Sequence, residues 1–224
     1  MNFGWVGRET GPPAEQAVLS GAMRRVFAVA VVVVMSCAGL ALTALPAGAA
    51  TATVTVDSAA DGAASPTNCA PTPVGGACTL RDAFAAASTG GADAGGAVTI
   101  SIASSIHAIS LSGGELDYDG GTGGAHALTV AGTAVTITTT TADRFIDNSG
   151  SGLLTISGLT LKDADSGDDG GAIESVGAVT VIDSALLNNH GDDGGAIDTQ
   201  GVIRITGSTL ADNTADSFGG AIEG

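Results

Sequence analysis

Short runs of β-branched residues, separated by Gly, Asp and Asn, make up most of the chain after residue 96. Residues 178–182 and 202–206 alternate apolar and polar side chains, which is typical of strands with one buried face. None of these stretches is long enough for an amphipathic helix. The pattern therefore predicts an all-β protein, with earlier strands at residues 97–102, 106–111, 127–130, 134–138 and 153–156.

The pattern repeats with a period of 24–25 residues. The sequence Gly-Gly-Ala-Ile occurs three times, and a second element ending in Leu recurs between its copies with the same period. A period in this range indicates a solenoid, whereas a propeller blade needs about 40 residues. We therefore expect a parallel β-helix with about three short strands per coil. The residues expected to define the repeat are Gly170, Gly171, Ile173, Gly194, Gly195, Ile197, Gly219, Gly220 and Ile222, with Asn189 and Asn213 at a second corner.

Each repeated position has an expected structural role. Glycine allows the positive φ that a tight corner requires. The Ile that follows should stack inside the solenoid on its counterparts in the neighbouring coils. Asn189 and Asn213 should form a hydrogen-bonded ladder, which ends at Ala164 because alanine lacks an amide side chain.

The first 49 residues have the order of a secretory signal peptide. Met23-Arg24-Arg25 precedes an apolar run over residues 26–45, and small residues follow. We expect cleavage after Ala49, and Met23 is a candidate for the true start. The alternative is an uncleaved membrane anchor, because 20 apolar residues can span a bilayer.

The composition of the chain disfavours one class of function and indicates how the core and the cysteines are used. Residues 50–224 contain 21 acidic and four basic residues, so they cannot neutralise many phosphates and a nucleic-acid-binding protein is disfavoured. Aromatic residues are only 3% of the chain, so small aliphatic side chains must fill the core. Two cysteines, Cys69 and Cys78, remain after cleavage, and an even pair in an exported chain predicts a disulfide.

One helix is expected over residues 79–88, because Thr79 and Asp82 have nearly the spacing of a capping box. We expect residues 50–96 to form an N-terminal cap with this helix and the disulfide, and residues 97–224 to form the β-helix. The repeat reaches Gly224 with no capping element. We therefore expect the β-helix to be truncated at its C-terminal end, in a fragment of a longer protein, or to end against a partner.

The motif Cys78-Thr79-Leu80-Arg81-Asp82-Ala83 resembles the Cys-Ser-Leu-Arg-Glu-Ala motif of CSLREA-domain proteins of bacterial surfaces. The Gly-Gly-Ala-Ile units, with Leu-Leu-Asn-Asn and Leu-Ala-Asp-Asn between them, resemble polymorphic outer-membrane-protein repeats. This resemblance covers most of residues 53–224. It implies a right-handed parallel β-helix of the pectin-lyase-like class within a surface protein.

The acidic corners are candidates for metal binding. Oxygen ligands at alternate positions around Gly suit Ca²⁺, but the spacing matches neither an EF-hand nor a Gly-Gly-x-Gly-x-Asp repeat. The simpler interpretation is solvated acidic turns, and no other cofactor is expected. The candidate ligands are Asp163, Asp165, Asp168, Asp192 and Asp193.

We expect a secreted or cell-surface scaffold, a non-catalytic adhesin-like or stalk module, and we assign no catalytic residue. Its partner would be a host or neighbouring-cell surface or a polysaccharide. Two alternatives stay open: a purely structural spacer, and a polysaccharide lyase or glycoside hydrolase of the pectin-lyase-like class. Paired carboxylates beside a basic residue in a groove would favour an enzyme, and a smooth acidic face would favour the scaffold.

Overall fold

The computed structural model describes residues 51–69, 77–88, 96–121 and 123–224. The expected signal peptide therefore lies outside the described residues. In the part of the chain that is described, no helix is both long and apolar enough to cross a membrane.

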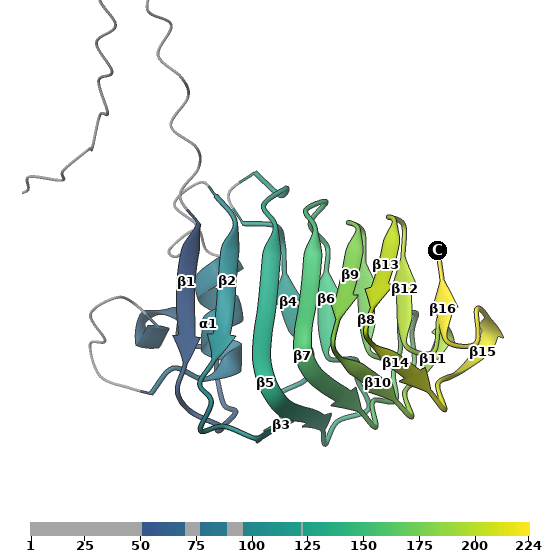
Figure 1. Ribbon diagram of the computed structural model, residues 1–224, viewed down its shortest axis with the longest axis horizontal. Coiled ribbons are helices and arrows are strands. Elements are labelled where there is room, and N and C mark those ends of the chain that lie inside the picture. The colour runs from purple at the N-terminus through teal and green to yellow at the C-terminus, as the bar shows by residue number, and fades with distance from the viewer. Residues whose placement is uncertain (1–50, 70–76, 89–95, 122) are drawn as a thin grey trace, which may run out of the picture. The chain divides into compact units, whose positions relative to one another are not determined.

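The described chain forms a parallel β-solenoid of about five turns, which confirms the predicted fold class. Its strands lie side by side along the solenoid, from β1 at one end to β16 at the other (Figure 1). Sheet A contains β1 (Ala52–Val56), β2 (Val98–Ile102), β3 (Ala108–Leu111), β5 (Leu128–Thr139), β7 (Leu154–Lys162), β9 (Val179–Ile182), β10 (Ala185–Leu187), β13 (Ile203–Thr206) and β14 (Thr209–Ala211). Sheet B contains β4 (Leu116–Tyr118), β6 (Ile146–Asn148), β8 (Ile173–Ser175), β12 (Ile197–Thr199) and β16 (Ile222–Glu223), and β11 (His190–Asp193) pairs with β15 (Thr214–Phe218).

The earlier strands belong to the same solenoid as the clear repeats, because β2, β5 and β7 are consecutive neighbours in sheet A. The two expected strands at 127–130 and 134–138 form one strand, β5, which begins at Leu128 and has an irregular register between Ala131 and Val135. Ala134 has a φ of 54°, so the strand bends there without ending. Strand β1 pairs in register with β2, so the segment expected to be a cap also supplies the first strand of sheet A.

The core is a narrow stack of aliphatic side chains. Ile197 pairs in register with Ile173 on one side and Ile222 on the other. On sheet A, Val179 and Val181 are buried, and they pair in register with Ile203 and Ile205 of the next coil. Inward positions thus repeat from coil to coil, and burial in such stacks supplies about 25 cal/mol per Å² of apolar surface.

Glycine is required at the Gly-Gly-Ala-Ile corners for two reasons. The first Gly has a positive φ in each copy, for example 68° at Gly170 and 54° at Gly194. In the first two copies, at Gly171 and Gly195, the second Gly lies against the next coil: a Cβ on Gly171 would lie 2.1 Å from the carbonyl oxygen of Gly195. Any larger residue there would push the coils apart.

The second corner is held by asparagine side chains. Asn189 Nδ2 donates to Asn213 Oδ1 over 3.0 Å, and Asn213 Nδ2 donates to the carbonyl of Leu186 over 2.9 Å. In the coil before, Asn189 Oδ1 accepts from the backbone N–H of Ala164 over 3.1 Å. Since Ala164 has no amide to continue the series, the ladder ends at this residue.

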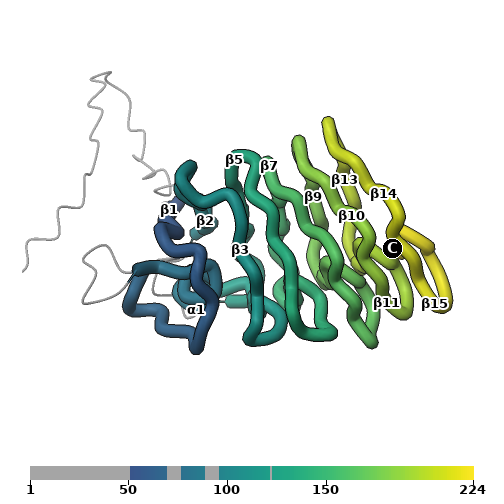
Figure 2. The backbone as a smooth tube through the Cα atoms, turned by 90° about the horizontal axis from the view of Figure 1, so that it is seen from below, coloured from purple at the N-terminus to yellow at the C-terminus, as the bar shows by residue number. Residues whose placement is uncertain are grey.

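The N-terminal helix α1 (Leu80–Ser88) contacts β4, the first strand of sheet B. Figure 2 shows α1 at the same end of the solenoid as β1 and β2. The capping box forms: the N–H of Asp82 donates to Thr79 Oγ1 over 3.1 Å, and the N–H of Thr79 donates to Asp82 Oδ2 over 3.2 Å. A disulfide joins Cys69, at the end of the 3₁₀ helix η1 (Pro66–Cys69), to Cys78. The predicted helix and the predicted disulfide are therefore both present.

Candidate functional site

The outer face of sheet B carries one carboxylate from every strand. Side chains alternate between the two faces of a strand, so the residue after each inward Ile or Leu points outward. Neighbouring strands lie about 4.8 Å apart, which fixes the spacing of these carboxylates. We call this set the sheet B column: Asp117, Asp147, Glu174, Asp198 and Glu223, paired in register from β4 to β16.

The N-terminal end of the column is its most crowded part. Carboxylate oxygens of Glu115, Asp117 and Asp147 all lie within 4.8 Å of one another. Burial raises the pKa of Glu115, and the charges of Asp143, Asp147 and Asp117 raise it further, while Arg144 opposes the shift. The pKa of Asp147 is raised by burial first and then by Asp117, again against the effect of Arg144.

Arg144 lies between carboxylates of the column and other carboxylates of the neighbouring coils. Its side chain is only 7% exposed, and its guanidinium makes ion pairs with Glu115 (3.2 Å), Asp168 (3.7 Å) and Glu174. These partners come from different coils, so one arginine links successive turns of the solenoid. Because its charge is shared among several carboxylates, it compensates each of them only in part.

Farther along the column, Asp198 lies among carboxylates. Burial raises its pKa, and the charges of Asp169, Glu223 and Asp193 add to the shift. Like charges that lie directly opposite each other in neighbouring strands destabilise a sheet. The column therefore holds unfavourable negative charge, which a bound cationic group would relieve.

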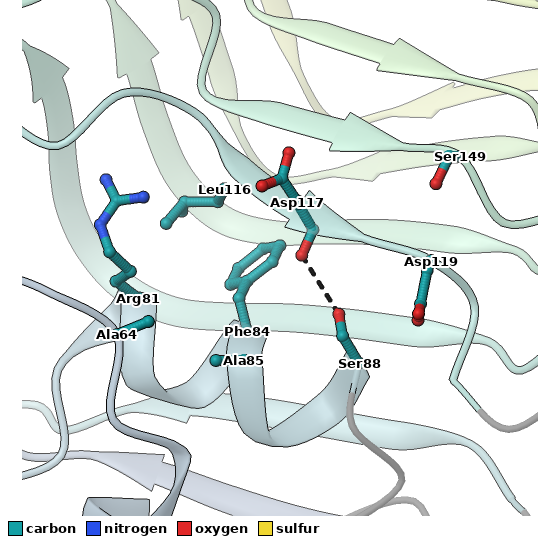
Figure 3. A pocket seen from close by; sticks show the side chains of 9 residues that line it. All are labelled: Ala64, Arg81, Phe84, Ala85, Ser88, Leu116, Asp117, Asp119 and Ser149. Atoms are coloured by element: carbon teal, nitrogen blue, oxygen red, sulfur yellow. Dashed lines mark hydrogen bonds between the residues drawn. The ribbon is translucent and has the colours of Figure 1, made fainter.

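A cavity of about 320 Å³ lies at the same end of the column, between α1 and β4 (Figure 3). Ser88 Oγ donates to the backbone carbonyl of Asp117 over 3.2 Å across this cavity. Arg81 also lines it, but its guanidinium binds Asp61 and the carbonyls of Gly114 and Glu115. The volume is at the small end of the range for ligand pockets. The lining residues are Ala64, Arg81, Phe84, Ala85, Ser88, Leu116, Asp117, Asp119 and Ser149.

The carboxylates expected to bind Ca²⁺ take part in contacts within the protein. Asp163 contacts Lys162 and Asn188, and Asp165 contacts His190. The other three have partners as well: Ser217 donates to Asp192, the N–H of Phe218 donates to Asp193, and Arg144 pairs with Asp168. Among the described residues, the one group of three close His, Cys, Asp or Glu ligand atoms is instead Glu115, Asp117 and Asp147.

A basic residue beside paired carboxylates would favour an enzyme, but the basic residue Arg204 lies on sheet A opposite Thr180, whereas Asp198 lies on sheet B. The structure therefore places these two residues on different sheets.

The sheet B column was missed by the sequence analysis, although the sequence contains a signal for it. Each Gly-Gly-Ala-Ile unit is followed directly by an acidic residue, which is Glu174, Asp198 or Glu223. The two earlier members have no such unit before them. Asp117 and Asp147 could be placed in the column only once the strand register was known.

Comparison of the chain with protein families, with curated proteins and with solved structures finds no match. The resemblance to CSLREA-domain proteins therefore stays a prediction that rests on the motif itself.

Proposed function

We propose that the chain is an exported β-solenoid scaffold, secreted or on the cell surface, which acts as a non-catalytic adhesin-like or stalk module. The observation that carries this proposal is the sheet B column, five carboxylates in register on one face. A face with repeated chemistry suits an extended partner, because repeat proteins generally bind through extended surfaces. The partner would be a host or neighbouring-cell surface or a polysaccharide that carries positive charge.

Export is supported by the signal-peptide pattern and is compatible with the disulfide, since disulfides persist in oxidising compartments. To test it, the full chain is expressed in a bacterial host, the cell fractions are separated, and the N-terminus of the exported form is determined. We expect a product that begins at Ala50. A full-length product in the cytoplasm would contradict export.

Binding is tested on the exported protein with immobilised chitosan, a cationic polysaccharide, and with dextran, a neutral one. We expect salt-sensitive binding to chitosan alone, because screening weakens attraction between exposed charges. Asp147→Asn with Asp198→Asn should weaken this binding severalfold. The matched control is Asp183→Asn with Asp212→Asn, which changes the net charge equally away from sheet B. Equal losses in both double variants would exclude a specific role for the column.

A glycoside hydrolase is the second candidate, favoured by the close carboxylates of Glu115, Asp117 and Asp147 beside a cavity. Retaining hydrolases use two carboxyl groups about 5 Å apart, and the general acid needs a raised pKa, as Glu115 has. Release of reducing ends from chitosan or polygalacturonate, lost in Glu115→Gln, would replace the scaffold with this second function. Polysaccharides left intact would favour the scaffold.

A further inference from the structure

Three coils meet at the imidazole of His190. This residue lies on β11, which is not part of sheet B. His190 Nδ1 lies 2.8 Å from Asp165 Oδ1, in the coil before. His190 Nε2 lies 3.2 Å from Asp216 Oδ1, on β15 in the coil after. Backbone pairing brings these three segments together, because His190 forms a bridge with Asp165 and pairs with Thr214, two residues before Asp216. We call these three side chains the His190 bridge.

This geometry fits the imidazolium form of the ring. A neutral imidazole has one N–H donor and one acceptor nitrogen, while an imidazolium has two donors. An ionised carboxylate can only accept. When the ring is neutral, one of its nitrogens therefore faces a carboxylate with lone pairs on both sides. Only the protonated ring can donate to Asp165 and Asp216 together.

The surrounding charges favour the same form. The bridge borders a cavity of about 390 Å³ whose lining includes Asp163 and Asp212. The nearby cation Lys162 is paired with Asp163 over 2.9 Å. On β11 itself, Asp192 and Asp193 accept from Ser217 and from the N–H of Phe218. Hydrogen bonds to Asp165 and Asp216, with the charges of both, raise the pKa of His190 above its ordinary 6.5, and slight burial opposes this.

The bridge is one of the side-chain contacts that hold β15 to β11. Their pairing is irregular between Gly191 and Asp193, and Asp216 lies in this irregular part of β15. Figure 1 shows β15 at the C-terminal end of the solenoid. Of the side-chain contacts between these two strands, the one with Asp216 depends on a group that titrates near neutral pH.

We propose that the His190 bridge is a pH-dependent contact. It holds β15 against the preceding coils when the imidazole is protonated and releases Asp216 when the imidazole is neutral. The contribution is fully present below the pKa of histidine in the unfolded chain, and it is lost as pH rises through the higher pKa in the folded protein. The proposal does not depend on the proposed function, because it concerns β11 and β15 and not sheet B.

The test uses the purified protein in EDTA, with NMR spectroscopy across neutral pH. The ¹⁵N shifts of the His190 ring report its protonation, and amide exchange at Ala215, Asp216 and Ser217 reports local opening. After correction for the intrinsic effect of pH on exchange, we expect opening to increase about two- to fivefold as the ring loses its proton, the range of an exposed charge pair.

The variants separate the bridge from a general effect of pH. In Asp165→Asn with Asp216→Asn, the ring of His190 should titrate at lower pH. In His190→Gln, opening of β15 should no longer change with pH, whereas the control His107→Gln, at an exposed position on another part of the solenoid, should keep the wild-type response. The proposal is overturned if the double variant leaves the titration of His190 unchanged. It is also overturned if local opening of β15 does not change when the His190 ring loses its proton.

Discussion

Arg81 Nε donates to Asp61 Oδ1 over 2.8 Å, and this pair joins the cap helix to the loop that follows β1. Asp61 also accepts from the backbone N–H groups of Ser112 and Gly113. Arg81 donates in turn to the carbonyls of Gly114 and Glu115, just before β4. The Leu-Arg-Asp part of the cysteine motif is therefore structural: Arg81 attaches the helix to the first coils, and Asp82 caps it.

We predict that Arg81→Ala destabilises the protein by about 3 kcal/mol, because it leaves a buried carboxylate without its cation. The side chain of Asp61 is 2% exposed and that of Arg81 is 12% exposed, so water could hydrate the unpaired carboxylate of Asp61 only slightly. Urea unfolding at neutral pH measures the change. Arg204→Ala is the control, since Arg204 is exposed on β13, and it should change stability by less than about 0.5 kcal/mol. Equal effects would mean that the ion pair has no special role.

The sequence was sufficient for the features that repeat or that are local. Ile173, Ile197 and Ile222 could be stacked from their period alone, and Thr79 with Asp82 predicted the helix start from spacing. Strands as short as β4 and β6 could not be predicted, because three residues contain too little alternation to recognise. The partners of Arg81 and Arg144 were also out of reach, since Asp61 and Glu115 lie 20 and 29 residues away along the chain and meet them only through folding.

Asp147→Asn should stabilise the protein at neutral pH by about 0.5 kcal/mol, because it removes like-charge repulsion with Asp117. The raised pKa of Asp147 means that the folded state binds a proton more readily than the unfolded chain. Its contribution therefore makes the free energy of unfolding fall as pH rises from about 4 through the folded pKa. Urea unfolding at several pH values should show a smaller fall in the variant.

Asp212→Asn is the matched control for this pH experiment, because it makes the same change in net charge at an exposed corner. Its φ of 58° suits asparagine as well as aspartate. A stabilisation of equal size in both variants would mean that net charge, and not the neighbours of Asp147, determines the effect.

Calcium should not raise the melting temperature at about 1 mM, the range in which extracellular calcium modules bind. A Ca²⁺ ion needs six to eight oxygen ligands, whereas Asp163, Asp165 and Asp192 each contact a different protein group. Thermal melting in Ca²⁺ and in EDTA makes the comparison. A rise in Ca²⁺ that disappears in Asp165→Ala with Asp192→Ala would instead identify the acidic corners as a calcium site.

Ile197→Asp should prevent cooperative folding of the coils around β12. Ile197 is fully buried and lies in register between Ile173 and Ile222, so the new carboxylate would have no water and no cation beside it. Burial of an unpaired charge costs far more than the stability of most domains allows. The control is Val202→Asp, which adds the same charge at a position that is 60% exposed. We expect the control to melt near the wild-type temperature and Ile197→Asp to lose the transition, and a normal melt for Ile197→Asp would contradict the stacked core.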